Sequence, residues 1–77
     1  MSRQTLEDCV RRSLENYFRE LDGEAAHNVY DMIMQSVEKP VLEFVMNRAE
    51  GNQSTAASIL GINRNTLRKK LQQHGLL

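Results

Sequence analysis

The sequence predicts an all-α fold, with four helices in a single domain spanning residues 1–77. It contains one proline and four glycines, and only 5% of its 77 residues are aromatic. Apolar residues recur at intervals of three and four rather than two, which indicates helices and not strands. The single cysteine, Cys9, excludes an internal disulfide. For a chain this short, association with a second copy is then the remaining route to adequate stability.

The first helix is expected from about Thr5 to Leu21. Its apolar residues follow one another at steps of three or four and share one face: Leu6, Val10, Leu14, Tyr17 and Leu21. Asp22 and Gly23 follow directly, and glycine accepts the left-handed backbone conformation that commonly ends a helix. We therefore place the end of the helix at Leu21.

A second, longer helix is expected from about Ala26 to Ala49, with a length of about 36 Å. Pro40 lies inside it and has no N–H to donate to the carbonyl of Ser36, so a kink is expected there. A long apolar helix in so small a protein predicts an intertwined homodimer, with residues 5–50 as the dimerisation part. The residues expected at this interface are Leu14, Tyr17, Val29, Ile33, Val37, Val41 and Val45. The alternative is a monomeric bundle in which this helix is broken at Lys39-Pro40.

The remaining segment, residues 51–77, has the pattern of a helix-turn-helix. Asn52 is a good N-cap for a short helix over 53–60, and Asn63 is a good N-cap for a last helix over 64–73. Gly61 supplies the tight turn between them. The buried side of the pair is expected to consist of Ala56, Leu60, Ile62, Leu67 and Leu71.

Charge is divided unequally along the chain. Residues 51–77 contain four Lys or Arg and no Asp or Glu, whereas residues 1–50 contain six basic residues against ten acidic ones. The formal charges are therefore +4 and −4, although the net charge of the whole chain is zero. A basic segment beside an acidic one is typical of a protein that presents one surface to nucleic-acid phosphates.

The last helix is expected to turn Leu67 and Leu71 inward and its polar residues to solvent. The N-terminal part of a recognition helix reaches base edges in the major groove. Arg64 is our candidate for reading sequence, because a guanidinium can bind the O6 and N7 atoms of guanine together. Thr66, Lys69, Lys70 and the cap region of residues 52–54 are candidates for phosphate contacts.

The run GNQSTAASILGINRNTLRKKL, with LENYFRELDG and VEKPVLEFVMNRAEGNQ before it, resembles the factor for inversion stimulation (Fis) family of bacterial nucleoid-associated proteins. The resemblance extends from about Leu6 to Leu76. It implies an intertwined homodimer whose two recognition helices lie closer together than one DNA turn, so that bound DNA must bend. With the residues expected on the outer face of the last helix, the DNA-binding set is Asn52, Ser54, Asn63, Arg64, Asn65, Thr66, Arg68, Lys69 and Lys70.

Two departures from the best-known family members shape our expectations. Those members have an N-terminal arm that activates a DNA invertase, whereas this sequence starts almost at the first helix, so the resemblance does not imply stimulation of recombination. They also carry lysines at the positions of Gln72 and Gln73, so we expect weaker contacts to flanking DNA and a smaller salt dependence. By analogy with the family, the turn around Gln53 and Ser54 is a candidate contact for RNA polymerase.

From the basic segment and the resemblance we expect a sequence-selective, DNA-bending and nucleoid-associated transcriptional regulator that acts as a homodimer. Three alternatives for function stay open: a local promoter regulator, a helix-turn-helix module like the C-terminal domain of enhancer-binding activators, and a helical protein-interaction module. We expect no enzyme and no cofactor, because the sequence shows no nucleophile–base pair and no glycine-rich phosphate loop. His27 and His74 are expected to be surface helix residues and not metal ligands. Without a signal peptide or a spanning apolar run, we expect the protein in the cytoplasm, at the nucleoid.

Overall fold

The computed structural model describes residues 3–77, which contain four helices and no strand. The elements are α1 (Arg3–Leu21), α2 (Val29–Arg48), α3 (Gln53–Leu60) and α4 (Arg64–Gln73). The all-α prediction is confirmed, and the last two helices begin and end where the sequence predicted. Within residues 3–77, none of the helices has the length and hydropathy needed to span a bilayer.

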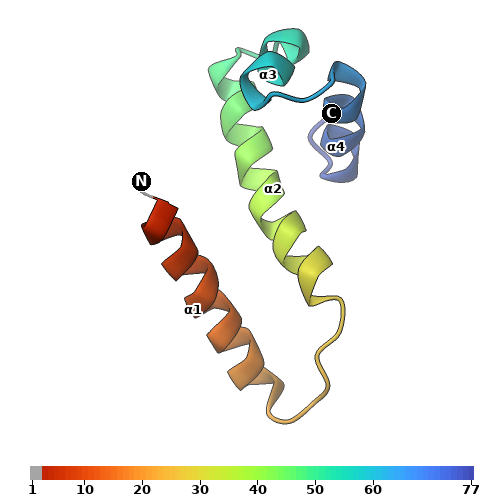
Figure 1. Ribbon diagram of the computed structural model, residues 1–77. Coiled ribbons are helices and arrows are strands. Elements are labelled where there is room, and N and C mark those ends of the chain that lie inside the picture. Colours follow the sequence, from red (N-terminus) through yellow and green to blue (C-terminus); the bar gives the residue numbers. More distant parts are fainter. Residues whose placement is uncertain (1–2) are drawn as a thin grey trace.

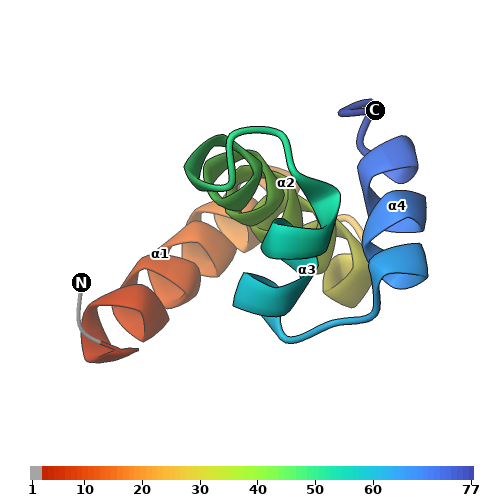
Figure 2. The same cartoon turned by 90° about the horizontal axis from the view of Figure 1, so that it is seen from above.

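The four helices form a compact group of three and one outlying helix. In Figure 1, α1 and α2 run antiparallel and are joined by a long loop, while α3 and α4 gather at the C-terminal end of α2. Figure 2 shows α1 diverging from the group that α2, α3 and α4 form. The radius of gyration is 15.1 Å, compared with about 11.5 Å for a compact chain of this length. The isolated chain is therefore elongated.

The hydrophobic core belongs to the compact group and lies between the C-terminal half of α2 and the helix-turn-helix. Its buried residues are Leu42, Ala49, Ala56, Ala57, Leu67 and Leu71. Half-buried residues that pack against them are Val45, Met46, Leu60, Ile62 and Leu76. The alanines of α3 have small side chains that allow the neighbouring helices to approach closely. Among its described side chains, α1 contributes no residue to this core.

The path of α2 differs from the sequence prediction at its start. The helix begins at Val29 and not at Ala26, because Asn28 adopts a left-handed backbone conformation with φ of 56° that a helix cannot continue through. It then runs without a break through Pro40, so the alternative of two helices divided at Lys39-Pro40 is wrong. The kink expected at Pro40 stays a prediction.

The turn between α3 and α4 is closed by a Schellman motif around Gly61. The N–H of Ile62 donates to the carbonyl of Ala57 at 3.1 Å, and the N–H of Gly61 donates to that of Ser58 at 3.2 Å. Gly61 has φ of 74°, in the left-handed region that glycine enters at little cost. This geometry ends α3 and directs the chain into α4.

We expect Gly61→Ala to destabilise the protein by about 1 kcal/mol, because a Cβ disfavours the left-handed conformation. No atom lies within 4 Å of the position that the new Cβ would occupy, so the cost comes from the backbone alone. Urea unfolding measures it. Ser58→Ala, at an exposed position of α3, is the control and should change stability by less than about 0.5 kcal/mol. Equal stability of the two variants would contradict this account of the turn.

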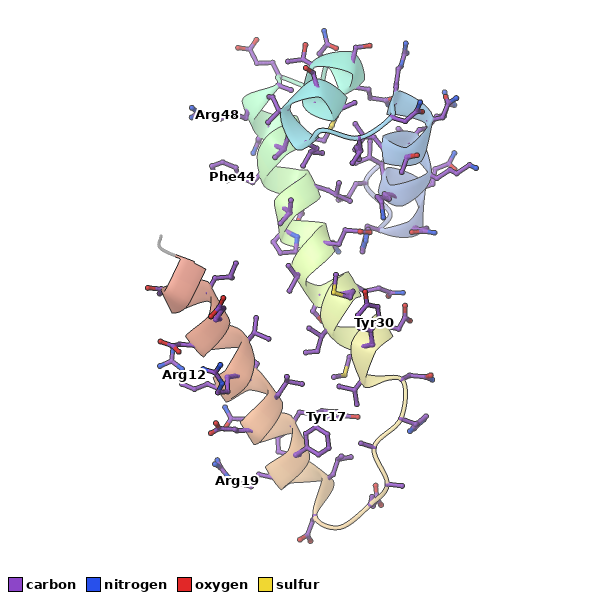
Figure 3. All side chains as sticks on the ribbon, viewed as in Figure 1. Arg12, Tyr17, Arg19, Tyr30, Phe44 and Arg48 are labelled. Atoms are coloured by element: carbon purple, nitrogen blue, oxygen red, sulfur yellow. The ribbon has the colours of Figure 1, made fainter. Side chains whose placement is uncertain are left out.

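Much apolar surface lies outside the core. The accessible surface is 6236 Å², about 1,400 Å² more than expected for a folded monomer of this mass. The large apolar side chains exposed on α1 and α2 are Leu6, Phe18, Tyr30, Met34, Val37, Val41 and Phe44. Figure 3 shows Tyr17 on the side of α1 that faces α2, with Arg12 and Arg19 on the opposite side. The apolar face predicted for α1 therefore points toward α2 without closing a core there.

None of the seven residues predicted at a dimer interface is fully buried within the isolated chain. Val37 and Val41 are exposed, and the other five are half-buried: Leu14, Tyr17, Val29, Ile33 and Val45. In the same view, Phe44 and Arg48 project from α2 on the side away from α4 (Figure 3). An apolar stripe along α2 thus stays open to a further contact.

Candidate nucleic-acid interface

Two asparagine side chains fix the starts of the helices that form the site. Asn52 Oδ1 accepts a hydrogen bond from the backbone N–H of Thr55 at 3.1 Å. Asn63 Oδ1 accepts one from the N–H of Asn65 at 2.7 Å. Both residues have extended backbone conformations, as N-caps do, so the capping predictions are confirmed. Each cap uses the side-chain oxygen and leaves the NH₂ group outside the capping bond.

The apolar residues of α4 decide which of its faces is turned to solvent. Leu67 and Leu71 are 0% exposed and hold that face in the core. After the helix, the N–H of Leu76 donates to the carbonyl of Leu71 at 2.8 Å, which folds the C-terminal residues back over α4. With this face buried, the opposite face, which carries Arg64 and Arg68, is turned to solvent.

Eight of the nine predicted DNA-binding residues are exposed: Asn52, Ser54, Asn63, Arg64, Asn65, Thr66, Arg68 and Lys69. They come from the start of α3 and from α4, and the helix-turn-helix brings these two segments together. No ion pair within the described residues engages Arg64, Arg68 or Lys69. The first turn of α4 also lacks an acidic residue. The partial positive charge of its N-terminus therefore adds to that of the arginines and favours an anion. Of the polymerase candidates, Ser54 is exposed and Gln53 is half-buried.

Lys70, the ninth residue, lies differently. Its Nζ is 2.8 Å from Glu38 Oε2 on α2, and the side chains are 34% and 28% exposed. The other carboxylate oxygen, Oε1, is 2.9 Å from His74 Nε2, and the His74 side chain is only 8% exposed. The expectation that His74 is a surface residue is thus wrong. His27 is exposed but lies in the loop between α1 and α2 and not on a helix.

The two partners change the acidity of Glu38. The hydrogen bond from Lys70, and after it the one with His74, lower the pKa of this carboxyl, while its partial burial acts in the opposite direction. A lowered pKa means that the charged form is stabilised in the folded chain. The stabilisation is complete above the pKa of the unfolded chain and disappears as the pH falls through the lower pKa of the folded one.

As the pH falls below 4.5, the ordinary pKa of glutamate, we expect the free energy of unfolding to decrease. Part of this decrease should be absent from Glu38→Gln, which has no carboxylate to protonate at this position. The difference between the wild type and the variant should shrink as the pH is lowered from neutrality to about 3, because protonation neutralises Glu38 in both states. For a network that is still partly exposed to solvent, we expect no more than about 1 kcal/mol. Urea unfolding at a series of pH values measures this. Glu43→Gln, an exposed carboxylate on the same helix, is the control, and an identical pH response of the two variants would contradict the prediction.

Two family profiles match the sequence of this chain. A family profile described as bacterial regulatory protein, Fis family, matches residues 33–74, and one described as DNA-binding protein Fis N-terminal domain matches residues 2–26. The chain belongs to the Fis family. A protein of Ralstonia nicotianae, whose name calls it Fis-like and DNA-binding, is 65% identical over 77 residues, which is 100% of both chains. Two proteins of Neisseria meningitidis, from serogroups A and B, bear the same name; each is 56% identical over 72 residues, or 94% of this chain and 91% of theirs.

The family match confirms the resemblance drawn from the sequence motifs. The Fis-family profile spans the whole helix-turn-helix, including the caps at Asn52 and Asn63 and the turn at Gly61. It also reaches back to Ile33 in α2, so it contains Glu38 together with both of its partners. Sequence reasoning had missed Glu38 and had placed His74 at the surface.

Proposed function

We propose that this Fis-family chain is a sequence-selective DNA-binding protein that acts as a homodimer and bends its target in regulating transcription. The observation that carries the proposal is the exposed cationic face of α4, which is fixed by burial of Leu67 and Leu71. The relatives named as Fis-like and DNA-binding support the choice of DNA as the ligand. No acidic side chain in residues 51–77 opposes the approach of phosphates.

The proposed contacts divide into two groups. Arg64, in the first turn of α4, reads guanine through its O6 and N7 acceptors in the major groove. Asn52, Ser54, Asn63, Asn65, Thr66, Arg68 and Lys69 contact the sugar-phosphate backbone or neighbouring base edges and set the register of the protein on the duplex. Lys70 belongs to neither group, because its ammonium group is bound to Glu38.

The homodimer is supported by the apolar surface left open on α1 and α2. An excess of about 1,400 Å² in each chain corresponds to about 2,800 Å² in a pair, within the range of obligate homodimers. Among its described residues α1 has no fully buried side chain, so a second copy would supply the surface against which it packs. The proposed interface consists of the seven residues predicted from the sequence.

Bending follows if the two copies of α4 lie closer together than the roughly 34 Å repeat of the major groove, as the family resemblance implies. The duplex must then curve between them and narrow its minor groove, which costs least in an AT-rich centre. We therefore propose targets with a guanine near each end and an uncontacted AT-rich middle. Such a protein acts where chromosomal DNA is, in the cytoplasm at the nucleoid.

We expect Arg64→Ala to weaken binding to such a duplex by about 1 to 3 kcal/mol and to affect arbitrary DNA much less. The loss of affinity is specific to the proposed target, because only that duplex has a guanine near each end for Arg64 to bind. Fluorescence anisotropy with labelled duplexes at several salt concentrations measures it. Arg12→Ala, which removes an arginine from α1, is the matched control and should bind like the wild type. Equal losses on both duplexes would show that Arg64 contacts backbone and not bases, and no binding by the wild type would contradict the proposed function.

A further inference from the structure

The contacts of Glu38 connect the two parts of the chain to which the proposed function gives different tasks. Within the described residues, the side-chain hydrogen bonds between α2 and α4 all end on this carboxylate. Its partners are separated from it by 32 and 36 positions in the sequence. They are one helical turn apart, with Lys70 in the last turn of α4 and His74 at its C-cap, so one acidic group holds the end of the helix at two points.

We propose that Glu38, Lys70 and His74 form a clamp that fixes the orientation of α4 relative to α2. The inference rests on the proposed function, because orientation matters only if two copies of α4 must fit one duplex. In the clamp Glu38 is a positioning residue, and Lys70 serves the fold and makes no phosphate contact. This gives Lys70 a role different from the one that the family resemblance implied.

The clamp complements the apolar contacts of α4. Leu67 and Leu71 anchor the helix in the core, where they are 0% exposed. Apolar packing is non-directional, so these two side chains alone permit some rotation of α4 about their line of contact. Glu38 lies one turn before the buried Leu42 on α2, and its carboxylate adds a directional contact beside the core. Two lines of attachment, one apolar and one charged, restrict that rotation.

The clamp also distinguishes two adjacent lysines. Lys69 is exposed and belongs to no ion pair in the described part of the chain, whereas Lys70 is bound to Glu38. To reach a phosphate, Lys70 would have to leave a carboxylate that is only 28% exposed and deprive it of one of its two partners. Unpairing a partly buried charge is unfavourable. Lys69 can therefore release counterions from DNA, and Lys70 stays on the protein.

In a dimer, the position of each α4 on its own α2 sets the separation of the two recognition helices. If the clamp is opened in both subunits, that separation varies, and fewer molecules present the spacing that a bent duplex requires. The apparent affinity for the bent site falls with the fraction of competent molecules. Binding to arbitrary DNA, which relies on phosphate contacts alone, should change little.

The test compares Lys70→Gln with Lys69→Gln in the full-length protein, on a duplex with guanines near both ends and an AT-rich centre and on an arbitrary duplex. Lys69→Gln should lower the slope of log K against log salt by about 0.9 for each phosphate that the protein no longer neutralises, or about 1.8 for a dimer. Lys70→Gln should leave the slope unchanged and weaken binding to the first duplex by about three- to tenfold. Lys70→Arg, which keeps the charge and the N–H donors, should restore binding to that duplex.

Two further readouts separate positioning from general loss of structure. Glu38→Gln should weaken binding as Lys70→Gln does, and the double variant should be no weaker than either single one, because the clamp opens once. Energy transfer between dyes at the ends of the duplex should show a reduced mean bend in both clamp variants and wild-type bending in Lys69→Gln. Tighter binding by Glu38→Gln, or a salt slope lowered as much by Lys70→Gln as by Lys69→Gln, would overturn the clamp. A wild type that binds neither duplex would instead contradict the proposed function.

Discussion

Val41→Glu is expected to convert the protein from a dimer to a monomer and to remove its high-affinity DNA binding. Val41 is 43% exposed in the isolated chain, so the substitution leaves the core of a single subunit intact. In the proposed dimer the same position is covered, and two carboxylates, one from each copy, would be buried without partners. Burying an unpaired charge costs several kcal/mol, so the dissociation constant should rise by at least about a thousandfold.

The helix content should fall in the same experiment. Among its described residues α1 has no fully buried side chain, and an isolated helix of about this length is only marginally stable in water. Sedimentation equilibrium gives the association state, and far-UV circular dichroism gives the helix content. Asn47→Glu, at an exposed polar position of the same helix, adds the same charge and should leave both unchanged. If Val41→Glu stays dimeric at micromolar concentration, this stretch of α2 does not belong to the dimer interface.

The parts of the fold that the sequence predicted depend on local signals. Asn52 and Asn63 cap the helices that follow them through hydrogen bonds to residues two or three positions away. Gly61 closes a turn through bonds that span three to five residues. Leu67 and Leu71 belong to one face because they are one helical turn apart. In each case neighbouring residues contain all the information needed, so the helix-turn-helix and its exposed face could be predicted in detail.

What the sequence did not predict depends on contacts between distant residues. Glu38 looked like one acidic residue among ten, and Lys70 looked like one cation in a basic run. Their pairing requires α4 to lie against α2, and periodicity within either helix says nothing about the distance between them. The start of α2 was missed for a different reason. Asparagine adopts the left-handed backbone conformation only in some contexts, and the residues around Asn28 did not indicate that it would do so here.

The hydrophobic core lies on both sides of the proposed boundary between the dimerisation part and the DNA-binding part. Leu42 and Ala49 lie in the segment that was assigned to dimerisation, yet they are buried with the residues of the helix-turn-helix. One side of α2 therefore holds the DNA-binding unit, while the apolar stripe with Val37 and Val41 stays open. If the proposed dimer forms on that stripe, one helix carries both contacts, and the placement of the second subunit then determines the placement of the recognition helix.

The second large effect is expected from Leu67→Ala, which should unfold the DNA-binding unit before the rest of the protein. Leu67 is 0% exposed in a core to which the described side chains contribute only two other buried residues larger than alanine, Leu42 and Leu71. Truncating a buried leucine to alanine typically costs about 2 to 5 kcal/mol, since the cavity is filled only in part. In so small a core, little other packing compensates for the loss. Specific DNA binding should disappear, because α4 no longer holds Arg64 in place.

The same substitution at Leu77, which is 57% exposed, is the control and should change stability by less than about 0.5 kcal/mol. Urea unfolding followed by circular dichroism measures both variants, and sedimentation measures their association. If α1 and the open stripe of α2 form the dimer, Leu67→Ala should remain associated while it loses DNA binding, whereas Val41→Glu loses association first. If Leu67→Ala loses association and DNA binding together, the dimer and the DNA-binding unit fold as one. The core around Leu42 would then be needed to hold α2 in the shape that its partner requires.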